Sequence, residues 1–319
     1  MSQTIFPRLS LDRSVIHWED HIDALTPVEE HVGLYWKRDD YFAPLGYGGV
    51  NGAKVRQILW VITRYLETKP KNPGILLAGS VKSPQLGRVA AVAKHFGIPC
   101  LLVIGSKPET AYKHNSNVQI AATLGAEFAT AKAPYNPALQ AEAKRLHAQR
   151  PDYYLVEYGL SIDGTPERIE SFYRFASEQA RSIPDDTETL LLPLGSCNTA
   201  IAVLYGLARH KPTALRKVAL FGIGPPRTEW FQQRLALLGI SQSPTYQIEI
   251  HDLHTTGFAT YQDEMPETVD GIALHPTYEG KMWRYLKTRR EIMQGKTCFW
   301  IVGSAPSLAA MNLRTDALG

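Results

Sequence analysis

The chain has 319 residues, of which 44% are hydrophobic, 20% charged and 10% aromatic, with 24 glycines, 21 prolines and three cysteines. This composition excludes a disordered chain and a single small module, and it fits one large domain or two moderate ones. The formal net charge of +3, from 34 basic and 31 acidic residues, is too small to indicate a polyanionic partner by itself.

The sequence lacks three kinds of signal, and their absence limits the expected cellular location and the kinds of site. The longest apolar stretches, such as the one around Leu101–Ile104, are far shorter than the roughly 18 residues that a membrane-spanning helix needs. Met1–Leu11 shows no pattern of a secretory signal. Cys100, Cys197 and Cys298 are widely spaced and match neither a disulfide framework nor a zinc-ligand pattern. We therefore expect no membrane association, no metal site and a reducing, cytoplasmic location.

The predicted elements alternate between short apolar strands and longer helical segments. Each apolar run ends in a glycine, which is typical of a buried strand followed by a tight turn. The expected strands lie within Ile75–Ser80, Leu101–Ser106, Tyr153–Gly159, Leu190–Ser196, Val218–Gly222 and Phe299–Ser304. The expected helices lie within Val55–Glu67, Leu86–Phe96, Asn117–Leu124, Pro137–Ala148, Pro166–Arg181, Thr199–Arg209, Glu229–Leu238 and Lys281–Met293. This alternation predicts an α/β fold with mainly parallel sheets, which bind ligands at the carboxyl ends of the strands.

A glycine-rich loop precedes the first expected helix. Four glycines between Gly46 and Gly52 are followed by Lys54 at the junction of loop and helix. Because the helix dipole disfavours a cation there, the position is unusual for a structural lysine. A desolvated amine near that end loses its proton more readily and can form a Schiff base, so Lys54 is a candidate catalytic residue. A solvated surface lysine is the alternative.

Two further strand-to-helix turns carry polar residues suited to anions. Gly195-Ser-Cys-Asn-Thr199 offers consecutive N–H groups and hydroxyls for a phosphate, although it lacks the P-loop and dinucleotide-binding patterns. Gly79-Ser-Val-Lys-Ser83-Pro-Gln85 suits a small carboxylate. The alternative for both turns is ordinary helix capping, with Ser196 or Asn198 as the cap in the first of them.

An acid and a phenol stand before the last expected helix, in His275-Pro-Thr-Tyr278-Glu279-Gly-Lys281. Glu279 can be an N-cap or a first-turn acid that stabilises the helix without any chemistry. The same helix carries several basic residues, which are more often a solvated face than a site for a polyanion: Lys281, Arg284, Lys287, Arg289 and Arg290.

Taken in order, these segments resemble the fold-type II pyridoxal-phosphate enzymes, which are tryptophan synthase beta-like, and in particular the branch of 1-aminocyclopropane-1-carboxylate deaminase and D-cysteine desulfhydrase. The resemblance covers about Tyr35 to Ser307 and includes Lys54-Val-Arg, Ser83-x-Gln85, Asn117-Val-Gln-Ile, the Gly195–Thr199 loop and Pro276-Thr-Tyr-Glu-Gly-Lys281. It implies two open, twisted, mainly parallel sheet domains with the cofactor in the interdomain cleft. Residues 1–56 plus 153–319 would form a large cofactor-binding domain, with 57–152 inserted as a small domain, and the protein would be a homodimer.

The resemblance also implies a role for each candidate residue. Lys54 would hold pyridoxal 5′-phosphate as a Schiff base and move the proton at the substrate α-carbon. Glu279 would face the ring nitrogen and stabilise its protonated form. Ser83, Gln85 and Tyr158 would bind the substrate, with Ser83 and Tyr278 as further catalytic groups. The cofactor phosphate would bind to Gly195, Ser196, Cys197, Asn198 and Thr199.

Some positions depart from the family pattern. Ala53 and Pro84 stand where the family usually has asparagine, so a hydrogen bond to the cofactor's phenolate oxygen or to the substrate is missing. The insertion Gly49-Val-Asn-Gly52 also alters the entrance to the expected site. We therefore expect cofactor binding to be retained and the substrate to differ.

Three functions remain as alternatives. The first is a lyase or deaminase that acts at the α-carbon of a free amino acid. The second is an enzyme, for example a decarboxylase, that acts on an amino acid attached to a larger carrier such as a hypermodified viral DNA base, with nucleic acid as a partner. The third is a non-catalytic binder of pyridoxal phosphate.

Overall fold

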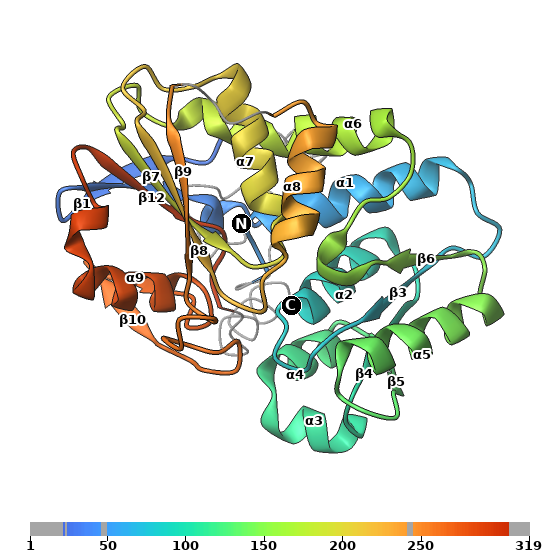
Figure 1. The fold of residues 1–319 in the computed structure, drawn as a ribbon. Helices are drawn as coiled ribbons and strands as arrows, with labels where there is room; N and C mark the ends of the chain where they lie inside the picture. Colours follow the sequence, from blue (N-terminus) through green and yellow to red (C-terminus); the bar gives the residue numbers. More distant parts are fainter. Residues whose placement is uncertain (1–21, 23, 46–49, 241–244, 306–319) are drawn as a thin grey trace, which may run out of the picture. The chain divides into compact units, whose positions relative to one another are not determined.

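The computed structural model describes residues 22, 24–45, 50–240 and 245–305. These residues form two compact units (Figure 1): unit 1 from Ile22 and Phe42–Ile162, and unit 2 from the described parts of Asp23–Tyr41 and Asp163–Ala305. Met1–Leu11 and Gly46–Gly49, on which two of the sequence expectations rest, lie outside the described residues. No helix in the described part of the chain is long and apolar enough to cross a bilayer.

Unit 1 is built on a parallel sheet with the strand order β5-β4-β3-β6. Its strands are β3 (Gly74–Ala78), β4 (Cys100–Ile104), β5 (Glu127–Thr130) and β6 (Tyr153–Val156). Its helices are α1 (Ala53–Glu67), α2 (Gln85–Phe96), α3 (Pro108–His114), α4 (Ser116–Thr123) and α5 (Asn136–Gln149), with a short 3-10 turn at Tyr158–Leu160. All residues of β3 and β4 are buried, as expected for strands covered on both faces.

The core of unit 1 follows from the alternation of side chains along its strands. Leu76 and Leu101 point to one face of the sheet, where Leu139 and Ala143 of α5 pack on them. The helix α2 contacts the same two strands, β3 and β4, and packs against α1 and α4. Along the chain, the carboxyl end of β3 leads into the turn before α2.

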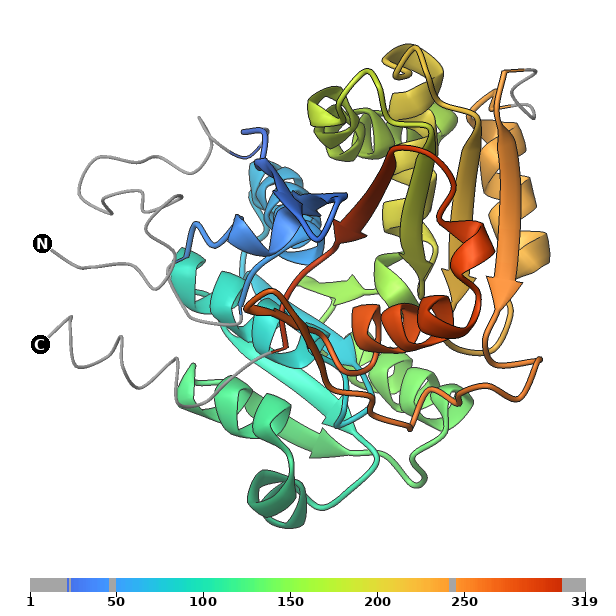
Figure 2. The ribbon, with the colours of Figure 1, turned by 90° about the vertical axis from the view of Figure 1, so that its left-hand side faces the viewer.

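Unit 2 contains a sheet with the strand order β1-β2-β12-β7-β8-β9, in which only β1 and β2 pair antiparallel. The strands are β1 (Val28–His31), β2 (Leu34–Arg38), β7 (Thr189–Leu194), β8 (Lys217–Gly222), β9 (Gln247–Asp252) and β12 (Thr297–Ile301), and β10 (Glu267–Val269) and β11 (Ile272–Leu274) form a separate hairpin. The helices are α6 (Pro166–Ser177), α7 (Asn198–Arg209), α8 (Thr228–Leu237) and α9 (Glu279–Thr288), with 3-10 turns at Asp39–Tyr41, Glu178–Ser182 and Arg290–Ile292. Figure 2 shows α9 on one side of this sheet and α6 and α7 on the other.

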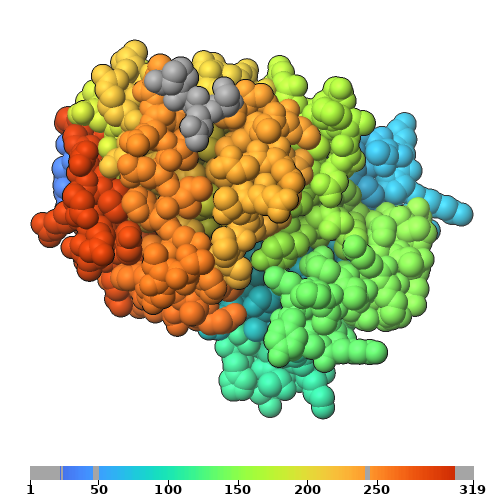
Figure 3. Space-filling model, viewed as in Figure 1, coloured from blue at the N-terminus to red at the C-terminus, as the bar shows by residue number. Residues whose placement is uncertain are grey.

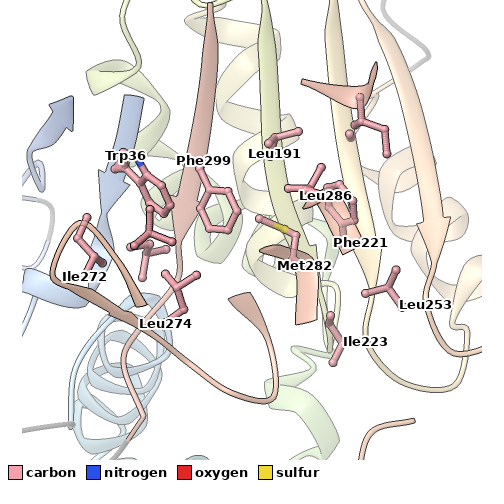
Figure 4. Packing of buried hydrophobic residues seen from close by; sticks show 14 residues of the cluster. Trp36, Leu191, Phe221, Ile223, Leu253, Ile272, Leu274, Met282, Leu286 and Phe299 are labelled. Atoms are coloured by element: carbon pink, nitrogen blue, oxygen red, sulfur yellow. The ribbon is translucent and has the colours of Figure 1, made fainter. Parts of the chain in front are cut away.

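The hydrophobic core between the sheet and α9 fixes the start of that helix. Met282 and Leu286 of α9 are fully buried against Trp36, Phe221 and Phe299 of the strands (Figure 4). Burying side chains of this size contributes about 2 kcal/mol each. The ring centroids of Trp36 and Phe299 lie 4.6 Å apart. Because this core holds α9 on the sheet, it also holds the Tyr278-Glu279 segment with which the helix begins.

The α/β class and the mainly parallel sheets are confirmed, and each strand expected from an apolar run is present. Two helix limits were wrong. The helix expected at Pro166–Arg181 ends at Ser177 and continues as a 3-10 turn, and the helix expected from Lys281 to Met293 runs from Glu279 to Thr288. The elements that the expected set lacked include β1, β5, β9, the β10–β11 hairpin and α3.

Gly280, the second residue of α9, has no space for a side chain. A Cβ atom there would lie 2.0 Å from the carbonyl oxygen of Met265 and 3.3 Å from that of His275. Since the obstructing atoms are backbone, we expect Gly280→Ala to lower the free energy of unfolding by about 3 kcal/mol. The measurement is urea unfolding followed by circular dichroism.

The matched control for this prediction is Gly224→Ala. Its new Cβ would meet only the Tyr261 side chain, at an ordinary contact distance of 3.7 Å. We expect this variant to unfold at nearly the wild-type urea concentration. If both variants unfolded at the same urea midpoint, the Met265 backbone would move at little cost, and the crowding at Gly280 would not affect the free energy of unfolding.

Candidate active site

Lys54 is the second residue of α1, and the N-cap residue of this helix, Gly52, has a positive φ of 87°. As a glycine, this N-cap residue has no side chain to cap the helix, and the first turn of α1 contains no acidic residue. The Lys54 side chain is half-buried, and its Nζ donates a hydrogen bond of 2.6 Å to the carbonyl oxygen of Gly159. The neighbouring Tyr158 is 44% exposed. The structure thus brings two predicted site residues, Lys54 and Tyr158, to one place in unit 1.

The turn between β3 and α2 carries the other two candidates of unit 1. The Ser83 hydroxyl accepts the backbone N–H of Gln85 at 3.3 Å, and Pro84 precedes the first residue of the helix. The side-chain Nε2 of Gln85 is buried, and it has no hydrogen-bond partner among the described residues. A buried amide donor without a partner costs free energy, and a carboxylate oxygen would remove that cost.

The loop Gly195–Thr199 connects β7 to α7 in unit 2. Cys197 is the N-cap residue and has a left-handed φ of 71°, and its side chain makes no capping hydrogen bond. The alternative in which Ser196 or Asn198 caps the helix is therefore wrong. The Asn198 side chain accepts a hydrogen bond from Tyr173, a phenol whose pKa burial raises. Since Asn198 is occupied in this way, the loop can offer an anion chiefly its backbone N–H groups and the half-buried Thr199 hydroxyl.

The left-handed conformation at Cys197 leads to a prediction about its replacement. Glycine relieves the strain of this conformation at the cost of a more flexible unfolded chain, so we expect Cys197→Gly to change the free energy of unfolding by no more than about 1 kcal/mol. Valine is branched at Cβ and disfavours φ values above zero, so Cys197→Val is expected to lose about 2 kcal/mol or more. Urea unfolding measures both changes.

Cys100→Val is the control for side-chain size. Cys100 is also buried, but it lies in β4, where a branched side chain suits the backbone. We expect this control to be less destabilised than Cys197→Val. If the two valine variants lost the same stability, crowding rather than backbone conformation would explain the effect.

Tyr278 and Glu279 start α9 in unit 2. The Glu279 side chain is fully buried, and its Oε1 accepts the backbone N–H of Val302 at 2.8 Å. A Cβ atom built on Gly195 would lie 3.1 Å from Cε1 of Tyr278, so the tyrosine ring packs against the Gly195–Thr199 loop. Glu279 is a first-turn acid, as expected, but its complete burial goes beyond what a capping role requires.

Two residues near this loop were not among the sequence candidates. The hydroxyl of Tyr261 lies 3.2 Å from that of Tyr278. Nη1 of Arg227 donates to the carbonyl oxygen of Ser196 at 3.2 Å. Neither residue belongs to a recognisable motif, and both come from loops whose path depends on the finished fold.

Three of the five basic residues predicted for the last helix lie in α9 and bind groups of their own unit, while Arg289 and Arg290 follow the end of the helix and are exposed. Lys281 is fully buried and donates to the carbonyl oxygens of Thr260, at 2.7 Å, and Tyr261, at 3.3 Å. Arg284 and Lys287 both bind the Glu267 carboxylate, at 2.9 and 2.6 Å, and the hydrogen bond from Lys287 is the main cause of the lowered pKa of Glu267. These contacts leave little of α9 for a polyanion.

The described residues fit pyridoxal phosphate in three respects. Lys54 presents a half-buried amine at a helix start, the Gly195–Thr199 turn presents the amino-terminal N–H groups of α7, and Glu279 presents a buried carboxylate. These are the groups that would hold an aldehyde, a phosphate and a protonated ring nitrogen. Lys54 belongs to unit 1, and the other two belong to unit 2.

Known proteins resemble the chain over nearly its whole length. A family model described as "Pyridoxal-phosphate dependent enzyme" matches residues 22–294. The O-seryl-dTMP PLP-dependent decarboxylase of Salmonella phage ViI is 34% identical, with 97% of this chain and 88% of the relative covered. The D-cysteine desulfhydrase of Salmonella choleraesuis (strain SC-B67) is 27% identical, with 97% of both chains covered.

Solved structures agree with these matches at the level of the fold. The crystal structure of an ACC deaminase homologue superposes with a TM-score of 0.69 and 20% identity, with 92% of this chain and 93% of that chain covered. The order of the segments along the sequence had already indicated this fold. The chain therefore belongs to the fold-type II family of pyridoxal-phosphate-dependent enzymes, and pyridoxal 5′-phosphate is its cofactor.

Proposed function

We propose that this enzyme decarboxylates an amino acid that is attached to a nucleotide. The observation that carries the proposal is the 34% identity, over 97% of the chain, to a phage decarboxylase named for O-seryl-dTMP. The D-cysteine desulfhydrase relative is matched over the same share of the chain at only 27% identity. A free amino acid, the substrate of the first alternative above, is thus the less favoured one.

In the proposed reaction the bond between the α-carbon and the carboxylate breaks, CO2 leaves, and the electron pair stays at the α-carbon. Pyridoxal phosphate, when bound, supplies the electron sink for that pair. Lys54 holds the cofactor and then returns a proton to the α-carbon, so that a hydrogen atom replaces the lost carboxylate. The Gly195–Thr199 loop binds the cofactor phosphate, and Glu279 stabilises the protonated ring nitrogen.

The turn at Ser83–Gln85 supports loss of the carboxylate. Hydrogen bonds to a carboxylate stabilise its charge, and that stabilisation opposes its departure as neutral CO2. Pro84 provides neither an N–H nor an amide side chain, so fewer donors are available in this turn. Ser83 and the Gln85 amide remain to orient the group, with Tyr158 and Tyr278 as further contacts to the substrate.

The test is a comparison of substrates with the purified holoenzyme. O-seryl-dTMP, free serine and free D-cysteine are each incubated with the enzyme, and CO2, sulfide, ammonia and the masses of the products are measured. We expect CO2 from O-seryl-dTMP, together with a nucleotide product lighter by one CO2. Sulfide or ammonia from the free amino acids, with O-seryl-dTMP unchanged, would overturn the proposal in favour of a free amino-acid lyase.

We also propose a homodimer in the reducing cytoplasm. The three cysteines are buried and form no disulfide, and burial raises the pKa of Cys100 and Cys298 to about 12, which suits unreactive thiols in such a setting. Sedimentation velocity measures the dimer directly. A single monomer boundary at micromolar concentration would contradict it.

A further inference from the structure

The turn that accepts the Lys54 amine has an unusual backbone conformation. Tyr158, Gly159, Leu160 and Ser161 form a β-turn shortly after β6, in which the Ser161 N–H donates to the Tyr158 carbonyl oxygen at 3.3 Å. Both central residues are left-handed, with a φ of 67° at Gly159 and 63° at Leu160. Positive φ at both central positions is characteristic of a type I′ turn.

The sequence of this turn favours a different type. A type II′ turn has glycine at its first central position and a residue with negative φ at the second, which suits Gly159-Leu160. In a type I′ turn, glycine typically takes the second central position. The hairpin turns between β1 and β2 and between β10 and β11 follow that rule, with Val32-Gly33 and Asp270-Gly271. Leucine therefore stands where these hairpins have glycine, in a conformation that disfavours a Cβ atom.

The two turn types differ by a half-turn of the peptide unit between the central residues. That rotation would bring Leu160 to a φ of about −120°, where leucine is unstrained, and Gly159 would tolerate it because glycine has no Cβ. It would also turn the Gly159 carbonyl oxygen away from Nζ of Lys54, which now donates to it at 2.6 Å. The strained orientation of this peptide is thus the one that holds the amine.

Burial explains how the strained orientation persists. The Leu160 side chain is 1% exposed, so the packing of unit 1 fixes its position. Of the left-handed residues other than glycine in the described part of the chain, Leu160 and Cys197 are buried, and the others are exposed: Val32, Lys69 and Asp270. Both buried ones lie in loops of the candidate active site. Strained conformations that the surroundings impose are concentrated at functional sites.

We infer that Leu160 is a positioning residue for Lys54. Its buried side chain keeps the Gly159–Leu160 peptide left-handed, and the Gly159 carbonyl oxygen holds the amine whenever that amine is not bonded to the cofactor. This inference rests on the role proposed for Lys54, and it holds for any substrate. A charged lysine amine has three N–H donors on a flexible chain, and a carbonyl acceptor fixes one of them. The amine then stays at one point of unit 1 rather than moving among many rotamers.

The experiment compares Leu160→Ile with Leu160→Met. Isoleucine has the volume of leucine, but its branched Cβ disfavours positive φ, so this variant should adopt the rotated peptide. Methionine is unbranched and of similar volume, so it should keep the peptide as it is. Both changes preserve an apolar side chain in the core, and circular dichroism checks that the variants fold.

The first readout is the reactivity of the Lys54 amine in the full-length apoenzyme. The protein is treated briefly with acetic anhydride, and peptide masses give the acetylation of Lys54 relative to Lys144. Lys144 is an exposed internal reference in α5, a helix on the surface seen in Figure 3. We expect the ratio to rise about 10-fold in Leu160→Ile, because the amine loses an acceptor that stabilises its charged, unreactive form, and to stay at the wild-type value in Leu160→Met.

Gly159→Asn tests the opposite direction. Asparagine tolerates a left-handed φ, but the first central position of the rotated turn is suited to glycine, so this variant should lock the present orientation. We expect its acetylation ratio to lie below the wild-type value. A ratio above that of the wild type would contradict the inference even if Leu160→Ile failed to fold.

Urea unfolding of the apoenzyme gives a second readout. Leu160→Ile is introduced into the wild-type protein and into Lys54→Met, which has no amine. The shift of the urea midpoint should be smaller in the Lys54→Met background, since no hydrogen bond to the amine is left to lose. Equal shifts in the two backgrounds, or equal Lys54 acetylation in folded Leu160→Ile and wild-type protein, would overturn the inference.

Failure of the underlying proposals looks different. If Lys54 of the wild-type holoenzyme gained no cofactor mass after borohydride reduction, the role of Lys54 would be wrong, and this inference would be wrong with it. If the proposed decarboxylation were wrong, O-seryl-dTMP would release no CO2, while the acetylation ratios and midpoint shifts would still follow the expected pattern.

Discussion

Replacing Lys54 by alanine is expected to lower kcat by at least about 10³-fold, because a positioned proton donor and base alone is worth about 10²–10⁴-fold and the covalent hold on the cofactor is lost with it. In the structure, Nζ of Lys54 lies 2.6 Å from the carbonyl oxygen of Gly159. Activity on the preferred substrate measures the effect. Borohydride reduction followed by intact-mass analysis measures the covalent link to the cofactor.

Lys144→Ala is the matched control for Lys54. Lys144 lies in α5 of the same unit, and it is exposed. We expect this variant to keep wild-type kcat and to gain the mass of reduced cofactor. If Lys54→Ala still gained that mass after reduction, another lysine would hold the cofactor, and the proposed role of Lys54 would be wrong.

Replacing Glu279 by glutamine is expected to lower kcat about 10²-fold, because a neutral amide does not stabilise the protonated ring nitrogen as a carboxylate does. The fold should survive, since the amide oxygen can still accept the Val302 N–H that Oε1 now accepts at 2.8 Å. Kinetics, circular dichroism and cofactor titration separate these effects. The cofactor should still bind, because Lys54 and the Gly195–Thr199 loop, which we propose to hold it, are unchanged.

Glu279→Leu provides the contrast. Leucine removes the acceptor and leaves the Val302 N–H unsatisfied, so this variant should also lose about 1–3 kcal/mol of stability. Wild-type kcat in a folded Glu279→Gln variant would show that the buried carboxylate serves the structure of α9 rather than the cofactor.

The central strands could be predicted from the sequence, and so could β6 at one sheet edge, whereas the edge strands β5 and β9 could not. The strands β3, β4, β7 and β8 lie inside their sheets, and their continuous apolar runs reflect burial on both faces. By contrast, β5 and β9 lie at sheet edges and carry exposed polar residues such as Glu127 and Gln247. Such residues protect an edge from further pairing, and they also remove the apolar pattern that reveals a strand.

In the candidate site, residues that stand in a local sequence motif could be predicted, whereas residues placed by contacts distant in the sequence could not. Lys54, Tyr278 and Glu279 were predictable because each stands in a short motif next to a helix start. The burial of Lys281 was not, since its carbonyl partners at Thr260 and Tyr261 come from a loop about twenty positions away. Arg227 and Tyr261 reach the Gly195–Thr199 region only after the strands of unit 2 have assembled.

The pairing of β12 with β2 bears on the order in which the chain folds during synthesis. Cys298 in β12 lies opposite Tyr35 in β2, and β12 also separates β2 from β7 (Figure 2). Unit 1 takes Phe42–Ile162 from one stretch of the sequence, so this stretch can fold while the ribosome is still translating the remainder of unit 2. Unit 2 must wait for Thr297–Ile301 to emerge, with β1 and β2 lacking their inner neighbour until then. A nascent chain truncated before β12 therefore exposes two unpaired strand edges, which makes it a substrate for chaperones and a hazard for aggregation.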